Sequence, residues 1–93
     1  MDGEPFEGGK AKKLIREILA NGTLVISKHA EKEMLEDGLV RQDAMSVLRG
    51  GLISEPAEED RQTWRYRVRT RRIVVVVAFR SEKELVVVTA WRL

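Results

Sequence analysis

The sequence predicts an α+β fold, in which three N-terminal helices and one short strand precede an antiparallel β-meander. Two observations lead to this fold class. Apolar residues recur at helical spacing in the first half of the chain, whereas beyond residue 63 they alternate as they do in strands. A length of 93 residues is that of one domain. We therefore expect a flexible, glycine-rich tail over residues 1–9 and a single domain over residues 10–93.

The helical spacing of apolar residues predicts three helices, over residues 10–20, 28–37 and 39–51. Glycines follow the first two helices and end the third, and Ser27 is a suitable N-cap for the second. Between the first two helices, residues 23–27 (TLVIS) are rich in β-branched side chains and predict a short strand. The first half of the chain is therefore expected to be mostly helical.

The second half of the chain predicts three strands joined by polar turns, over residues 64–69, 73–79 and 85–91. The preceding segment, residues 54–62, is expected to be a polar loop, with a weak extra strand near residues 52–53. The last two strands are apolar on both faces, which is typical of strands covered on both sides. Three short helices do not cover both faces of such a sheet, so we expect part of one face to be left for a partner or ligand.

Charge is divided unevenly along the chain. Residues 1–60 carry 8 Lys or Arg against 13 Asp or Glu, and residues 61–93 carry 9 against 2. This asymmetry favours a surface that faces a polyanion, although the two halves can also neutralise each other within one domain. The chain has no cysteine, which excludes disulfides, thiolate nucleophiles and zinc–thiolate sites and fits a cytoplasmic protein. The sequence shows neither a signal peptide nor an apolar run that could span a membrane.

Arginine alternates with apolar residues in the first of the three late strands. If Trp64, Tyr66 and Val68 face the core, the arginines between them form a row on the opposite face, roughly 7 Å apart. That spacing is close to the separation of phosphates along one nucleic-acid strand, roughly 6–7 Å. The row consists of Arg65, Arg67 and Arg69. Arg71 and Arg72 extend it around the turn, and Arg80 and Arg92 flank the neighbouring strands.

Two interpretations of this row remain open. No acidic residue lies between Arg61 and Glu82, so an anion or an acidic partner is expected to supply the missing charge, and the guanidinium group binds phosphate bidentately. Alternatively, the arginines protect an edge strand against aggregation. The sequence contains no Ser-His-Asp set, no glycine-rich phosphate loop and no cluster spaced for a metal, so we expect no metal or cofactor.

Cleavage of RNA without a metal is compatible with these residues, because the 2′-hydroxyl of RNA is itself the nucleophile. Such a site needs a proton carrier and cations directed at the phosphorane. His29 is the only histidine, and Tyr66 is a second candidate proton donor, although alternation turns it away from the arginines. The alternative for His29 is a structural role at a helix start, and Trp64 and Trp91 are expected to anchor the core rather than to stack on bases.

The order of elements and a set of spaced residues resemble the RelE/MqsR-like toxin superfamily, which includes the BrnT toxins. The residues that carry this resemblance are Ser27, His29, Ala30, Met34, Gly38, Leu39, Asp43, Val47, Leu48 and Gly51. The resemblance implies an mRNA-cleaving toxin of a type II toxin–antitoxin pair. It also implies an antitoxin encoded alongside, such as one with a zinc-finger and a helix-turn-helix domain. The family pattern has a basic residue after the final strand, where this chain has Arg92.

The sequence and the resemblance together lead to two functional hypotheses. The first is a metal-independent mRNA endoribonuclease in which Arg65, Arg67 and Arg92 stabilise phosphate charge and His29 or Tyr66 carries protons. The other arginines of the row would then bind RNA or the antitoxin. The second hypothesis is a non-catalytic interaction domain whose basic sheet face binds RNA or an acidic protein.

Overall fold

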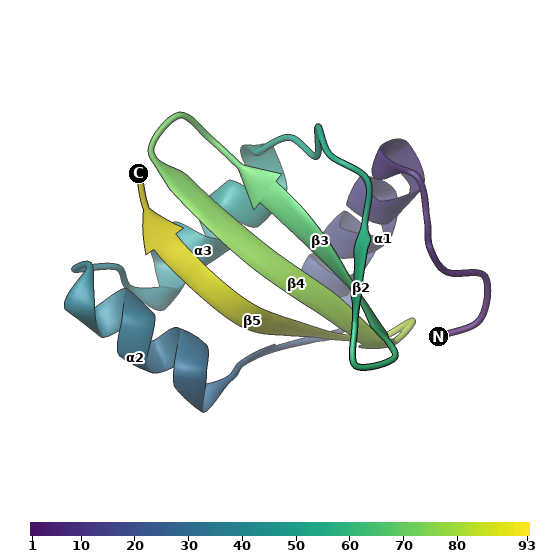
Figure 1. The fold of residues 1–93 in the computed structure, drawn as a ribbon, viewed down its shortest axis with the longest axis horizontal. Helices are drawn as coiled ribbons and strands as arrows, with labels where there is room; N and C mark the ends of the chain where they lie inside the picture. Colours follow the sequence, from purple (N-terminus) through teal and green to yellow (C-terminus); the bar gives the residue numbers. More distant parts are fainter.

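The computed structural model describes all 93 residues and contains three helices and five strands (Figure 1). The elements in chain order are α1 (Gly8–Asn21), β1 (Thr23–Ile26), α2 (Lys28–Glu36), α3 (Arg41–Gly50), β2 (Glu58–Asp60), β3 (Thr63–Arg69), β4 (Ile73–Ser81) and β5 (Glu84–Arg92). The strands form one sheet in the order β1-β5-β4-β3-β2. None of the helices has the length and apolarity that crossing a membrane requires.

The sheet is mixed, so the predicted fold class, with one short strand among the helices and then a simple antiparallel meander, is wrong. β1 pairs in parallel with β5, from Thr23 opposite Glu84 to Ile26 opposite Val87. β2 forms within the predicted polar loop and pairs antiparallel with β3. Local apolar patterns indicate that a strand exists but not which strand it joins, and β1 joins the strand farthest from it in sequence. β2 carries no apolar alternation, because its three residues are all acidic and exposed.

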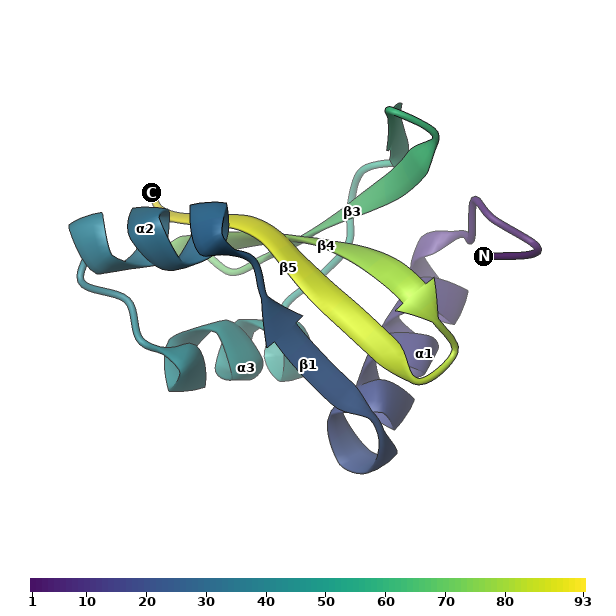
Figure 2. The same cartoon turned by 90° about the horizontal axis from the view of Figure 1, so that it is seen from below.

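The core lies on one face of the sheet, which α1 and α3 cover (Figure 2). The inward-facing side chains of β3 are Tyr66 and Val68, which are at most 1% exposed, as the alternation predicts. Their register partners on β4 are Val77 and Val75, which are completely buried. Lys12 of α1 is the one buried charged residue, and its Nζ donates to the carbonyls of Leu48 at 2.7 Å and Arg49 at 3.2 Å. These two bonds join α1 to the C-terminal end of α3.

The first nine residues, for which the sequence predicts a flexible tail, contribute to the core. The Phe6 side chain is 7% exposed, and its ring packs against the rings of Tyr66 and Phe79. The backbone N–H of Phe6 donates to the Tyr66 hydroxyl at 3.0 Å, and that hydroxyl donates to Glu4 at 2.9 Å. Glu7 caps α1 by accepting bonds from the first backbone N–H groups of the helix.

α2 covers the edge of β5 where β1 ends. A β-bulge leaves Val88 without a partner on β4, because Val77 lies opposite Val87 and Val76 lies opposite Thr89. The Val88 carbonyl accepts a bond from the Ser27 hydroxyl at 3.1 Å, and the same hydroxyl caps α2 by accepting from Ala30 N–H at 3.1 Å. Ser27 is thus the predicted N-cap, and it also fixes the start of α2 against the sheet.

The other face of the sheet has no helix across its centre. In Figure 1 this face is toward the viewer, with α1 and α3 behind it, α2 along one side and β2 along the other. Short elements therefore border the face rather than cover it, as the small number of helices predicts. We call this surface the open face.

Candidate functional site

A cavity of about 240 Å³ lies on the open face between β2 and β5. It is lined by Pro56, Glu58, Asp60, Arg65, Arg67, Val76, Thr89 and Trp91, and we call it the groove. Arg67 lies opposite Val76, and Val76 lies opposite Thr89, so these three residues form one row across β3, β4 and β5. Directly opposed residues share a face of a sheet, and the row therefore joins β3 to the β5 side of the groove.

Two arginines of the groove are paired with carboxylates of β2. Arg65 Nη1 lies 3.0 Å from Asp60 Oδ2, and Arg67 Nη2 lies 3.9 Å from Glu58 Oε1. The Arg65 side chain is 32% exposed, and its Nε is buried without a hydrogen-bond partner. The arginine row is therefore partly neutralised by acidic residues of the front half of the chain, but the donors of Arg65 are not all satisfied.

Trp91 is half-buried at the β5 side of the groove. The Arg67 guanidinium carbon lies 5.9 Å from the centre of the Trp91 ring, within the range of a cation–π contact. Trp91 also lies opposite Val74 of β4, on the same face as the arginines. The tryptophan that the sequence assigns to the core thus lines the groove and presents an aromatic surface beside a cation.

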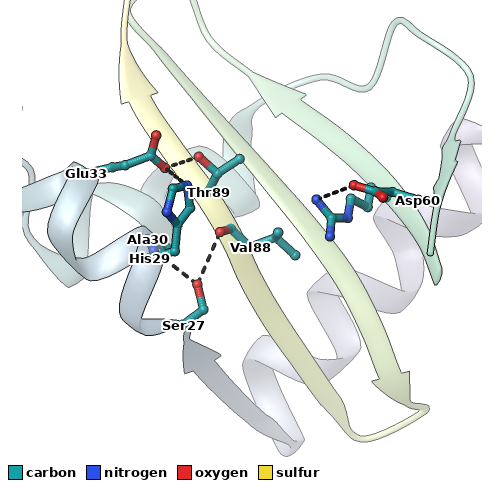
Figure 3. A network of polar contacts seen from close by, with 8 residues as sticks. Ser27, His29, Ala30, Glu33, Asp60, Val88 and Thr89 are labelled. Atoms are coloured by element: carbon teal, nitrogen blue, oxygen red, sulfur yellow. Dashed lines mark hydrogen bonds and ion pairs between the residues drawn. The ribbon is translucent and has the colours of Figure 1, made fainter. Parts of the chain in front are cut away.

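His29 belongs to a polar network at the start of α2, beside the groove (Figure 3). Its Nε2 lies 3.2 Å from Glu33 Oε1, and the same carboxylate oxygen accepts a bond from the Thr89 hydroxyl. The His29 side chain is 69% exposed, so it is not a core histidine. Ser27, rather than His29, ties this end of the helix to β5. The imidazole is therefore accessible, and Glu33 links it to a residue that lines the groove.

The groove differs from the other cavities of the chain in the chemistry of its lining residues rather than in its size. A larger cavity of about 590 Å³ lies between the N-terminal segment and α1, but no histidine or arginine lines it. No group of three or more His, Asp or Glu side chains is arranged to hold a metal ion. The residues of the groove and its network offer guanidinium groups, an aromatic ring and an imidazole on one face.

Tyr66 lies on the opposite side of the sheet from the arginines. Burial raises the pKa of Tyr66 to about 12, and the hydroxyl is engaged with Phe6 and Glu4. Arg92 follows Trp91 on β5, but it lies opposite Ile73 and so belongs to the other face of the sheet, where its backbone N–H donates to Asp37 at 2.8 Å. The structure therefore brings Arg65 and His29 to one face but places Tyr66 and Arg92 outside the groove.

The remaining arginines divide into two groups. Arg69 extends the exposed row of β3, and Arg71 and Arg72 occupy the turn before β4; none of the three has a carboxylate within 4 Å. Arg80 lies near the other end of β4 and pairs with Glu84 at 2.9 Å. The first group continues the positive surface beyond the groove, whereas Arg80 is neutralised away from it.

Sequence patterns alone miss several residues of the groove and its network. Glu58 and Asp60 alternate as Arg65 and Arg67 do, but only the β2–β3 pairing shows that they meet. Glu33 lies one helical turn after His29, a spacing that is visible in the sequence, whereas its bond to Thr89 depends on the position of α2 against β5. Contacts between distant segments therefore complete the site.

Comparison with known proteins gives one relationship. No curated protein and no solved structure matches the chain. A family model described as a domain of unknown function, DUF4258, matches residues 26–92, which include every residue of the groove, the His29 network and the four strands β2 to β5. The chain therefore belongs to the DUF4258 family.

Proposed function

We propose that the chain is a metal-independent endoribonuclease that cleaves single-stranded mRNA and acts as the toxin of a toxin–antitoxin pair. The observation that carries this proposal is the row formed by Arg67, Val76 and Thr89. It places the guanidinium groups in the same groove that the His29–Glu33–Thr89 network borders. The groups to which the proposal assigns charge stabilisation and proton transfer thus lie on one face.

The size of the row suits one phosphodiester and its riboses. Neighbouring strands lie roughly 4.8 Å apart, so the backbones of Arg67 and Thr89 are separated by about 10 Å. In the proposed reaction the 2′-oxygen of RNA attacks the adjacent phosphorus, and the 5′-oxygen of the next nucleotide leaves. His29 takes the proton from the 2′-hydroxyl and returns it to the departing 5′-oxygen, and Arg65 and Arg67 stabilise the charge on the phosphorane oxygens. Trp91 offers a surface on which a neighbouring base stacks.

The toxin assignment rests on the resemblance carried by Ser27, His29 and the glycine-ended helices that follow. In the structure Ser27 fixes α2 on β5, and His29 follows it on the accessible face of that helix. The motif residues therefore have a physical role in presenting the imidazole. The proposal places the chain in the cytoplasm, with mRNA as substrate and an antitoxin as its inhibitor.

Cleavage by the purified chain tests the enzymatic proposal. With a single-stranded RNA and a chelator present, the unmodified chain is expected to produce fragments that end in a 2′,3′-cyclic phosphate. His29→Ala is expected to bind RNA but to lose cleavage, and Arg65→Ala is expected to bind RNA more weakly and to lose cleavage. Arg80→Ala, which changes a paired arginine outside the groove, serves as the matched control. Cleavage by His29→Ala at the unmodified rate would contradict the role of the imidazole.

Expression in a bacterial host tests the toxin proposal. The unmodified chain is expected to arrest growth, and Arg65→Ala is expected to relieve the arrest while accumulating to the same level. Co-expression of the neighbouring gene is expected to restore growth. Normal growth with the unmodified chain expressed would remove the toxin assignment.

A second candidate is a non-catalytic domain that binds RNA or an acidic protein through the same face. It is favoured by one observation, that Tyr66 and Arg92 lie outside the groove and leave His29 as the proton carrier there. RNA binding that depends on Arg65, with no cleavage by the unmodified chain, would establish this candidate in place of the enzyme.

A further inference from the structure

We infer that the groove receives two successive backbone phosphates of single-stranded RNA, at the positions that the carboxylates of Asp60 and Glu58 take in the free chain. This inference rests on the proposed function and extends it, because it defines the substrate positions and predicts that β2 competes with RNA. The residues that carry it are Arg65 and Arg67 with their two partner carboxylates.

The spacing of the two ion pairs fits adjacent phosphates. Arg65 and Arg67 are two residues apart on one face of β3, and each has one carboxylate of β2 as its partner. Two strand rises separate them by roughly 7 Å, close to the distance between neighbouring phosphates of one strand. A carboxylate and a phosphate present the same feature to a guanidinium, namely anionic oxygens that accept charge-assisted hydrogen bonds. The carboxylates therefore indicate where anionic oxygens bind.

Arg65 is bound incompletely in the free chain. Asp60 Oδ2 engages Nη1 at 3.0 Å, whereas the buried Nε has no acceptor. The hydrogen of Nε points to the same side of the guanidinium as Nη2, away from Nη1, so an anion held at Nη1 does not also reach Nε. A phosphate that takes the place of Asp60 therefore exchanges one charge-assisted contact at Nη1 for another and leaves Nε as it is in the free chain.

β2 is held to the rest of the sheet by few contacts. Its three residues are exposed, it is an edge strand, and it pairs only with β3. The turn that follows holds two non-glycine residues, Arg61 and Gln62, at φ values of 53° and 68°, which L-residues adopt with strain. The two ion pairs are themselves exposed to solvent, with Asp60 49% and Glu58 66% exposed, and exposed pairs are weak.

The neighbouring residue Glu59 provides a matched control. It lies opposite Trp64, its side chain points to the other side of β2, and it has no arginine within 4 Å. Glu59→Gln therefore removes the same charge from the same strand without freeing an arginine. A variant with Asp60→Asn and Glu58→Gln removes both charges that face the groove.

Binding of a fluorescently labelled single-stranded RNA at low salt tests the inference. Asp60→Asn with Glu58→Gln is expected to lower Kd about tenfold, which corresponds to two exposed ion pairs, and each single variant about threefold. Glu59→Gln is expected to change Kd less than twofold. Because salt screens exposed pairs, the gain is expected to shrink as salt is added. Thermal melting of each variant checks that it is folded. If the double variant melts at a lower temperature than the unmodified chain, the Kd values of the two single variants provide the test.

The outcomes separate the inference from the proposed function. If the two substitutions leave Kd unchanged or raise it while Arg65→Ala weakens binding, the inference is overturned and the groove still binds RNA. An equal gain from Glu59→Gln also overturns it, because general repulsion would then explain the effect. If Arg65→Ala binds RNA as tightly as the unmodified chain, the proposed function fails as well.

Discussion

Tyr66 and its two arginine neighbours show how single residues acquire different roles on one strand. Successive side chains of β3 point to opposite faces, so Tyr66 enters the core while Arg65 and Arg67 line the groove. The hydroxyl of Tyr66 accepts a hydrogen bond from the backbone N–H of Phe6 and donates one to the carboxylate of Glu4. The tyrosine therefore holds the N-terminal segment in place rather than taking part in the chemistry of the groove.

The position of Tyr66 predicts a loss of stability at high pH. Burial raises its pKa from the ordinary value of 10.0 to about 12, so the folded chain holds the phenolic proton more tightly than the unfolded chain does. The stabilisation is complete below pH 10 and is lost as the pH rises toward 12. Tyr66 is the only tyrosine, so its ionisation is followed directly by ultraviolet absorbance. Ionisation near pH 10 in the folded chain would contradict the buried placement.

The junction of α1 and β1 is the element on which the mixed sheet depends. Gly22 separates the two elements, and Thr23 N–H donates to the Lys83 carbonyl at 2.8 Å, where the parallel pairing of β1 with β5 begins. A Cβ on Gly22 would lie 2.3 Å from that carbonyl oxygen. The glycine is therefore required by the close approach of two backbones.

Two glycine substitutions are expected to act in opposite directions. Gly22→Ala forces β1 and the β4–β5 turn apart and is expected to destabilise the fold by about 2 kcal/mol. Gly50→Ala places a methyl group in open space at the end of α3 and is expected to stabilise it by up to about 1 kcal/mol. Chemical denaturation measures both effects. A gain in stability from Gly22→Ala would show that the backbones do not approach as described.

Elements that depend on local pattern could be predicted from the sequence, and those that depend on distant partners could not. The alternation around Tyr66 shows which side chains of β3 face the core, and Ser27 marks the start of α2. The parallel partner of β1 and the existence of β2 depend instead on contacts between segments far apart in sequence. The same distinction holds for the site. The arginine row is visible in the sequence, whereas the Thr89 contact that brings Glu33 to the groove is not.

At the scale of the whole molecule, the uneven charge of the chain is only partly neutralised. Asp60 and Glu58 of the acidic half form ion pairs with Arg65 and Arg67. The exposed arginines at the end of β3 and in the next turn have no carboxylate within 4 Å. Neutralisation between the two halves is therefore partial, and the polyanion that would face the remaining positive surface stays a prediction. The acidic half screens the groove, and the positive surface beyond it continues in the direction of Arg69.

This distribution gives the molecule a direction along which RNA is expected to lie. Phosphates in the groove are expected to contact Arg65 and Arg67, and the RNA strand is expected to continue toward Arg69 and the turn that holds Arg71 and Arg72. Arg80 lies off this path and is paired with its own carboxylate. Affinity for RNA is therefore expected to depend on the first group of arginines and not on Arg80.

The salt dependence of RNA binding tests the central claim, that the groove arginines contact phosphates, most directly. Each phosphate contact on a single strand contributes about −0.7 to the slope of log K against log salt. The slope of Arg67→Ala is expected to be shallower than that of the unmodified chain by about 0.7, and Arg65→Ala by a similar amount, while Arg80→Ala keeps the full slope. Equal slopes for the unmodified chain and both groove variants would contradict the account.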